Sequence, residues 1–155
     1  MRSVHPFPAA LVDGDIPAVT DMLAPDVVLY SPILSRYRFR GHDRVVPLLT
    51  AITEIVSDPE ILEDFGDRER RLVAVRGRIR GTRIEVAALL TFDESAAVRE
   101  IKIFARPLPG VAALMAALGP RLAHSTTAAA LMTAVAVPFA AVAPVFDRAA
   151  ERLVR

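Results

Sequence analysis

Three side chains are the main candidates for chemistry in this sequence: Tyr37, His42 and Arg106. Tyr37 and His42 can each donate or accept a proton, and Arg106 can hold a carboxylate or an enolate oxygen. Each also has a structural interpretation. Tyr37 fits a loop aromatic packed on a rim, and His42 fits a solvent-facing residue at a helix start. Arg106 fits an ion pair with Asp93 or Glu94.

The composition excludes several classes of site. The chain has no Cys, which removes disulfides, thiolate catalysis and thiolate metal ligands. Its three histidines, His5, His42 and His124, are scattered, so we expect no metal site, and we expect no cofactor. The net charge is +1, with acidic and basic residues mixed along the chain. No basic patch is interleaved with aromatic residues, so we expect no nucleic-acid partner.

A long uncharged segment raises the question of a membrane. Residues 125–146 carry no charge and are numerous enough to span a bilayer. The segment is dominated by Ala and Thr and is interrupted by Pro138 and Pro144, so we expect a helical flap or a subunit contact instead. Residues 1–8 lack the uninterrupted apolar core of a secretory signal. We therefore expect a cytoplasmic protein.

The hydrophobic pattern predicts an α+β domain. Apolar residues recur at helical spacing in the first part of the chain, and period-two alternation follows. Pro25 is expected to end the second helix, and residues 33–40 are expected to be an irregular loop. We expect helices at 7–12, 15–24, 42–56 and 111–122, with a further helix at 145–154, and strands at 27–31, 61–65, 72–80, 84–92 and 98–106.

The alternation in the last three strands predicts one apolar face and one charged face. Arg76, Arg78 and Arg80 share a face and suggest an anion site. The simpler interpretation is a solvated outer face on which Glu85 and Glu100 neutralise the arginines across strands. We expect the simpler arrangement.

Several short motifs resemble the NTF2-like superfamily, which includes SnoaL-like polyketide cyclases and ketosteroid isomerases. They comprise a Gly-Asp-Ile opening and the following turn, an entry to the long helix, a hairpin and a strand end. The motifs lie at 14–16 and 23–28, 39–45, 90–93 and 98–101, and 106–108. They occur in the family's order, and the match covers roughly residues 5–123.

The resemblance implies a cone, in which a curved antiparallel sheet wraps around the N-terminal helices and encloses a pocket. It implies a domain at 1–123, with an Ala-rich helical extension at 124–155. Homodimers formed through sheet faces, as in many relatives, are also implied. The expected pocket residues are Phe7, Leu29, Ser31, Leu49, Ile52, Val86, Ala88, Leu90, Ile101 and Ile103.

The catalytic residues of the family do not carry over. The resemblance places the tyrosine, the base and the second acid of ketosteroid isomerases at Phe7, Ser31 and Ala88. The acid that SnoaL-like cyclases use near the end of the last strand is missing at 104–106. The Asp-Arg-Asp relay of NTF2-like epoxide hydrolases also lacks a counterpart, because no carboxylate pair is expected on the inner face of the sheet.

These observations leave two main functional hypotheses, and membrane association through residues 125–146 is a third. In the first, the domain binds a small, mainly apolar molecule, with or without a cofactor-independent cyclisation, isomerisation or dehydration that depends on shape and desolvation. In the second, it is a non-catalytic interaction or dimerisation module whose pocket is filled by its own side chains or by the tail. Because the carboxylates of these three enzyme classes are absent, whether the protein is an enzyme stays open.

Overall fold

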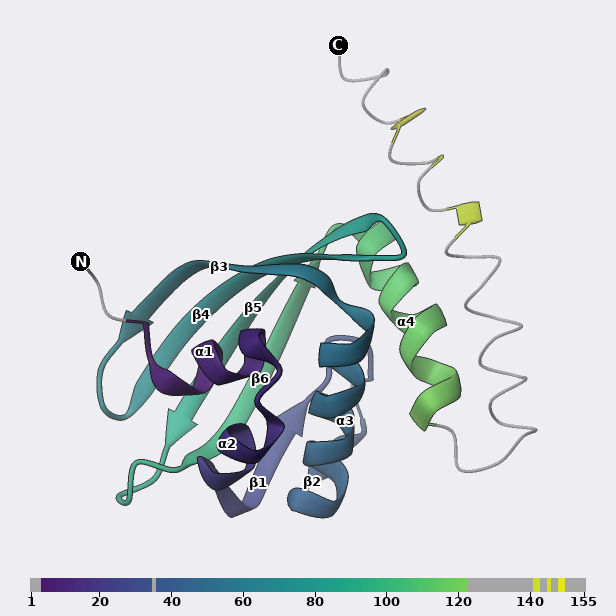
Figure 1. Ribbon diagram of the computed structural model, residues 1–155. Coiled ribbons are helices and arrows are strands. Elements are labelled where there is room, and N and C mark those ends of the chain that lie inside the picture. Colours follow the sequence, from purple (N-terminus) through teal and green to yellow (C-terminus); the bar gives the residue numbers. More distant parts are fainter. Residues whose placement is uncertain (1–3, 35, 123–140, 143–144, 146–147, 150–155) are drawn as a thin grey trace.

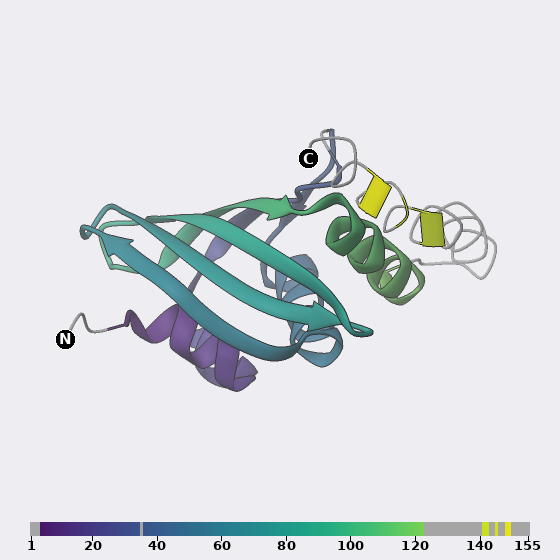
Figure 2. The ribbon, with the colours of Figure 1, turned by 90° about the horizontal axis from the view of Figure 1, so that it is seen from above.

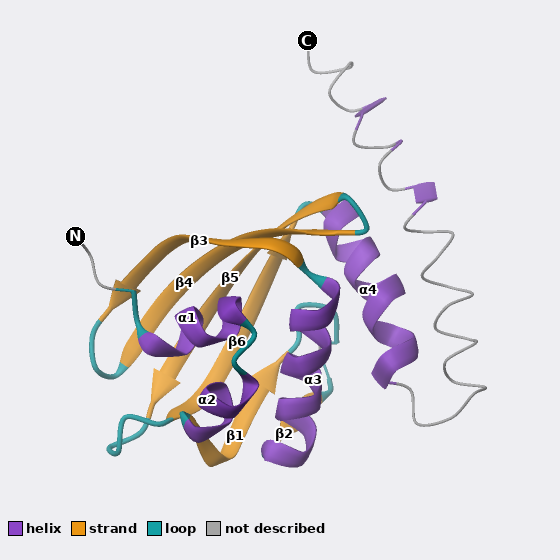
Figure 3. Cartoon of the chain, viewed as in Figure 1, coloured by secondary structure: helices purple, strands orange, loops and turns teal. Residues whose placement is uncertain are grey.

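The computed structural model describes residues 4–34, 36–122, 141–142, 145 and 148–149 (Figure 1). Nearly all of the expected extension at 124–155, including most of the expected helix at 145–154, lies outside these residues. The elements are α1 (Pro6–Asp13), α2 (Ile16–Asp21), β1 (Leu23–Tyr30), β2 (Arg38–Arg40), α3 (His42–Ile55), β3 (Ser57–Gly66), β4 (Arg70–Ile79), β5 (Thr82–Phe92), β6 (Val98–Arg106) and α4 (Leu108–Leu122). This order confirms the predicted α+β class (Figure 3).

The strands form one open, curved sheet in the order β2-β1-β6-β5-β4-β3. All neighbouring strands run antiparallel except β1 and β6, so the sheet is mixed rather than wholly antiparallel. Register shifts interrupt the β1–β6, β3–β4 and β5–β6 pairs, and such bulges increase the local bend and twist. Figure 2 shows the curvature, with α1 and α3 against the concave side.

Two strands begin four residues before their predicted bounds, two others differ by one or two residues, and one is new. β1 begins at Leu23 and runs through Pro25, because the register shift between Leu23 and Val28 leaves room for a residue without an N–H. β3 begins at Ser57, directly after α3, whereas the sequence predicted that this strand begins at Ile61. β2 lies in the segment predicted to be irregular. Its three residues are too few to show an alternation.

Two glycines allow close packing around the concave face. A Cβ on Gly77 in β4 would lie 2.5 Å from Val56 Cγ1, so the glycine lets the end of α3 approach the sheet. A Cβ on Gly110 in α4 would lie 2.5 Å from the Arg83 carbonyl oxygen. Because Gly110 has no Cβ, α4 can start directly against β5. The two glycines thus allow α3 and α4 to pack closely against the same side of the sheet.

The core lies between the concave face and the helices. α3 contributes Val45, Leu48 and Leu49, which pack with Leu29 of β1 and Leu90 of β5. Burial of these apolar side chains is the main source of stability for such a domain. None of the helices in the described part of the chain is both long and apolar enough to cross a membrane.

Candidate ligand-binding cavity

A cavity of about 600 Å³ lies between the concave face of the sheet and the helices. Its lining includes every pocket residue that the sequence predicted: Phe7, Leu29, Ser31, Leu49, Ile52, Val86, Ala88, Leu90, Ile101 and Ile103. The strand residues come from alternate positions of β5 and β6, and the register pairs Ala88 with Ile103. Alternation along the strands therefore builds an apolar wall. Whether these residues bind a ligand stays a prediction.

The helix α4 completes the wall with side chains that the sequence did not assign to the pocket. Leu114, Met115, Leu118 and Leu122 all line the cavity. They recur at helical spacing, a pattern that predicts a buried helix face but does not indicate what that face covers. This face lines the cavity. The helix α4 itself lies beside α3 (Figure 1).

Polar side chains are few among the described lining residues, and most have partners within the chain. Ser31 Oγ accepts hydrogen bonds from the Ile33 and Leu34 amides, at 3.1 and 3.3 Å. Thr53 Oγ1 donates to the Thr50 carbonyl oxygen at 2.8 Å. A serine hydroxyl that accepts two bonds can still donate one. Ser31 is thus a point at which the cavity can hold a ligand oxygen.

The two ionisable side chains among these lining residues are Asp13 and Arg76. Asp13 is exposed at the end of α1. The guanidinium group of Arg76 lies on the outer side of β4, where Nη2 contacts Glu60 Oε2 at 2.7 Å. The hydrogen bond and the charge of Glu60 raise the pKa of Arg76 above its usual value. Neither group offers a desolvated acid or base to the cavity.

The predicted chemical candidates lie outside the cavity lining. Tyr37 is 46% exposed and meets Phe39 edge to face, with ring centroids 5.0 Å apart. His42 Nε2 lies 3.2 and 3.1 Å from the carbonyl oxygens of Leu23 and Ala24, so it ties the start of α3 to β1. Tyr30 faces the outer side of the sheet, where it contacts Lys102, whereas the next residue, Ser31, lines the cavity. The proton-transfer role predicted for Tyr37 and His42 has no geometric support.

Arg106 also turns away from the cavity. Its side chain is 80% exposed and pairs with Glu85, with Nη2 and Oε2 2.8 Å apart. The structural alternative predicted Asp93 or Glu94 as the partner, and this was wrong, because Glu85 is the cross-strand neighbour of Arg106. Glu100 contacts Lys102 on its own strand.

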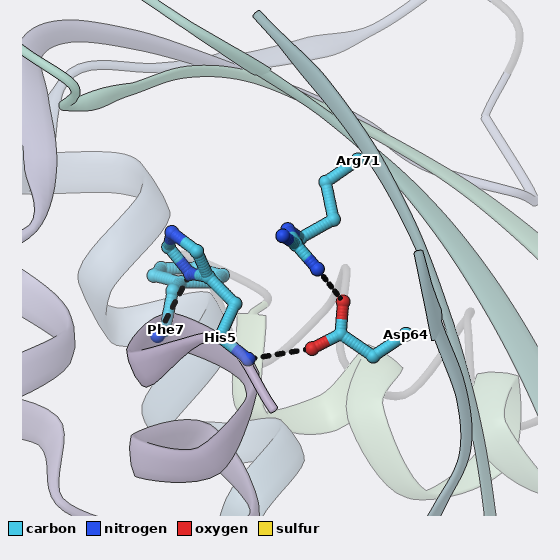
Figure 4. Close-up of polar contacts among 4 residues, drawn as sticks. All are labelled: His5, Phe7, Asp64 and Arg71. Carbon is cyan, nitrogen blue, oxygen red and sulfur yellow. Dashed lines mark hydrogen bonds and ion pairs between the residues drawn. The ribbon is translucent and has the colours of Figure 1, made fainter. Parts of the chain in front are cut away.

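A polar cluster that the sequence reasoning missed lies at the other end of the concave face (Figure 4). Asp64 Oδ1 accepts from Arg71 Nη1 at 2.5 Å, and Asp64 Oδ2 accepts from the His5 amide at 2.6 Å. The Asp64 side chain is only 5% exposed. His5 Nδ1 accepts from the Phe7 amide at 3.2 Å, which caps the start of α1.

The missed position of Asp64 has a clear physical cause. Ile61 pairs with Val75 on the inner face, so strict alternation would turn Asp64 outward. A register shift between Ile61 and Glu63 reverses this, and Asp64 pairs with Val73 on the inner face. Nothing in the residue types signals that bulge.

These two regions have different chemical capacities. The cavity can enclose an apolar molecule and offer it one hydroxyl. The polar cluster holds a carboxylate, a guanidinium group and an imidazole, but the carboxylate of Asp64 already accepts hydrogen bonds from Arg71 and from the His5 amide. No group of three His, Asp or Glu side chains suited to a metal ion occurs in the described part of the chain.

No protein-family model matches this sequence, and no curated protein matches it. Solved structures do match. An uncharacterised bacterial protein with a cystatin-like fold, from Silicibacter pomeroyi, aligns with a TM-score of 0.70 and 21% identity over 77% of this chain and 87% of that one. A steroid delta-isomerase from Pseudomonas aeruginosa aligns with a TM-score of 0.68 and 19% identity, covering 74% and 85%. A SnoaL-like protein of unknown function from Burkholderia thailandensis gives 0.55 and 14%, covering 66% and 89%.

The chain has the NTF2-like fold. This confirms the resemblance drawn from the sequence motifs, at the level of the fold. The three positions that the resemblance gave to isomerase catalysis, Phe7, Ser31 and Ala88, all line the cavity. The NTF2-like cone is therefore present here with two apolar residues and one hydroxyl where an isomerase needs acids and a tyrosine.

Proposed function

We propose that this protein binds a small, neutral and mainly apolar molecule in its cavity. The observation that carries the proposal is the apolar lining, in which ionisable groups are either exposed at the rim or paired on the far side of the sheet. A charged ligand would lose its hydration without gaining a partner, at a cost of several kcal/mol, on the order given for buried unpaired ions. A neutral ligand gains from burial against the same walls.

The volume supports a binding function over a self-filled module. A space of about 600 Å³ is within the range of small-molecule sites, roughly 300–1,000 Å³. If the protein also catalyses a reaction, the lining favours a cofactor-independent cyclisation, isomerisation or dehydration driven by shape and exclusion of water. The steroid delta-isomerase among the structural neighbours is in keeping with a ligand of this size class. A cytoplasmic location stays a prediction.

The experiment is a binding titration with the neutral fluorescent dye N-phenyl-1-naphthylamine. Ala88 faces the cavity and Ala87 faces the outer side of β5, so Ala88→Phe and Ala87→Phe are a matched pair. We expect Ala88→Phe to reduce dye affinity at least tenfold because the new ring fills the cavity, and Ala87→Phe to leave it within twofold. Equal binding by both variants, or no binding by the unmodified protein, would contradict the proposal.

The natural ligand can be sought by native mass spectrometry of the purified protein, followed by denaturation. We expect a mass greater than that of the polypeptide chain alone, and we expect a neutral organic molecule to be released when the protein unfolds. A bare mass in every preparation, together with failure to bind the dye, would favour the non-catalytic interaction module.

We also propose that the protein forms a homodimer through the outer face of its sheet. On this face, an apolar strip crosses β3 to β6 and includes Phe65, Leu72, Leu89 and Phe104. Phe104 is 59% exposed and Phe65 is 49% exposed. The ion pairs of Arg76 with Glu60 and of Arg106 with Glu85 border the strip. Contiguous exposed apolar residues with a polar border are typical of protein interfaces.

The oligomeric state tests this second proposal. Phe104→Glu places a charge in the apolar strip, whereas Tyr37→Glu places one at an exposed aromatic residue of the β1–β2 loop. In sedimentation velocity, we expect a dimer for the unmodified protein and for Tyr37→Glu, and a monomer for Phe104→Glu. A monomer in all three samples would refute the dimer and leave the ligand proposal intact.

A further inference from the structure

The start of α1 is fixed by a titratable side chain. Ser, Thr, Asp and Asn are the usual residues at a helix N-cap, whereas α1 uses His5, whose Nδ1 accepts a hydrogen bond from the Phe7 amide at 3.2 Å. An imidazole nitrogen accepts a hydrogen bond only while it is unprotonated. The cap therefore exists only in the neutral form of His5.

This helix end is part of the cavity wall. Phe7, two residues after the cap, is 2% exposed and belongs both to the core and to the cavity lining. Pro8, Leu11 and Val12 continue the same wall along α1. Movement of the first turn of α1 would therefore move Phe7 away from the sheet and open the cavity at this end.

The side chains around His5 come from three strands and from two turns. From β3, Asp64 binds the His5 amide at 2.6 Å, and from β4, Arg71 binds the other carboxylate oxygen (Figure 4). From β5, the Phe92 ring lies with its centroid 5.0 Å from that of His5. The recess beside the imidazole is also lined by Asp67, Arg68, Asp93 and Glu94 from the two adjoining turns.

The balance of these groups favours the neutral imidazole. Burial lowers the pKa of His5, the positive charge of Arg71 lowers it further, and Asp64 raises it in part. Asp64 is a weak counterion for His5 because its two oxygens already accept from Arg71 and from the His5 backbone. A proton on His5 would thus face a guanidinium group and would displace the Phe7 amide from its acceptor.

We propose that His5 is a proton-sensitive latch: its protonation releases the first turn of α1 and opens the cavity beside Phe7. The opening itself does not depend on the proposed function. Its consequence, weaker retention of the ligand at acidic pH, rests on the proposed function. Because the folded pKa is lowered, the latch is closed above the ordinary histidine value of about 6.5 and loosens as the pH falls below it.

Amide hydrogen exchange of the full chain at pH 7.5 and pH 5.5 tests the latch. The matched variant is His5→Asn, because asparagine is a good N-cap that keeps an acceptor for the Phe7 amide and does not titrate in this range. After correction for intrinsic exchange rates, we expect protection of residues 7–12 in the unmodified protein to fall more than twofold at pH 5.5, with about tenfold as the upper limit, because this pH lies about one unit below the ordinary histidine value. In His5→Asn, we expect protection to change less than twofold.

The proposal is wrong if protection of α1 in the unmodified protein does not depend on pH, or if His5→Asn loses protection to the same extent. The same two proteins are then titrated with N-phenyl-1-naphthylamine at both pH values. We expect a weaker affinity at pH 5.5 for the unmodified protein only. Exchange that follows the prediction while the dye never binds would support the latch and refute the proposed function, so the two failures are distinct.

Discussion

The two ends of the concave face are built from the same strands but hold opposite kinds of side chain. On β4, Arg71 and Val73 are successive inward residues, and Arg71 meets the buried carboxylate of Asp64 while Val73 lines the cavity. Only two residues along one strand separate an ion pair from an apolar wall. The boundary between the polar end and the apolar end lies near Phe7. The Phe7 side chain packs in the core, and its backbone amide donates to the imidazole of His5.

The difference shows how charge is distributed in this cone. At the polar end, the buried carboxylate of Asp64 is matched by Arg71 and by the His5 amide, although Arg71 Nε is buried without a hydrogen-bond partner. The cluster thus fixes β3, β4 and the start of α1 together. At the apolar end, nothing needs to be matched, so the space is free for a ligand. The carboxylate of Asp64 and the guanidinium group of Arg71 therefore stabilise the fold, and the cavity is the proposed binding site.

The largest expected effect comes from removing the acid at the polar end. Asp64→Ala leaves Arg71 partly buried with no carboxylate and leaves the His5 amide without its acceptor. Removing one partner of a buried pair costs about 3–5 kcal/mol, so we expect a loss of that order in the free energy of unfolding. Urea denaturation followed by circular dichroism measures it.

The control for this change is an ion pair on the outer face. Glu60 and Arg76 contact each other at 2.7 Å, but both side chains are well exposed. An exposed pair contributes about 0–1 kcal/mol, so Glu60→Ala should lower stability by no more than that. Similar losses in both variants would mean that the polar cluster does not anchor the fold.

A charge introduced at the apolar end should have the next largest effect. Val86→Glu places a carboxyl on the cavity wall, where burial raises the pKa of the acid. A raised folded pKa means that stability is full below the unfolded value of about 4.3 and is lost as the pH rises through the folded value. The loss is about 1.4 kcal/mol for each pH unit that separates the two values. Chemical denaturation between pH 4 and pH 7.5 measures the slope.

The comparison variant is Val86→Gln, because the side chain of glutamine has nearly the same shape as that of glutamate but does not titrate. We expect it to be destabilised equally at all these pH values relative to the unmodified protein. If Val86→Glu shows no additional pH dependence, the new side chain reaches water, and the wall at this position is not closed off from solvent.

Much of the apolar end could be predicted from the sequence. Period-two alternation in residues 84–92 and 98–106 placed Val86, Ala88 and Ile103 on the inner face, and the structure places them on the cavity wall. Alternation succeeds there because β5 and β6 remain in register through these residues. The long helix α3 was equally clear, since its apolar residues follow the helical period over 42–55.

The polar end could not be predicted, because its geometry depends on a bulge and on contacts between distant segments. The register shift after Ile61 turns Asp64 inward, and the His5 amide that binds Asp64 lies 59 positions away in the sequence. The opposite error concerns Tyr37, His42 and Arg106. Their residue types suggested chemistry, but type alone does not determine where a loop or strand end points its side chain.

The smallest expected effect sharpens the boundary between the two ends. Ser31 is a lone hydroxyl at the rim of the apolar wall, and its oxygen accepts from the Ile33 and Leu34 amides. Ser31→Ala removes that acceptor, and the loss of a hydrogen bond of this kind costs about 1 kcal/mol of stability. Ser57, whose hydroxyl lies on the exposed start of β3, is the control, and Ser57→Ala should change stability by less.

The same substitution separates two uses of that hydroxyl. N-phenyl-1-naphthylamine has no strong acceptor for the Ser31 hydroxyl, so its affinity should stay within about twofold in Ser31→Ala. An apolar ketone of similar size that competes with the dye should lose about fivefold to tenfold, the value of one hydrogen bond. Equal losses for the dye and the ketone would show that Ser31 acts by holding the loop after β1 in place, and equal retention would show that the ketone oxygen lies elsewhere in the cavity.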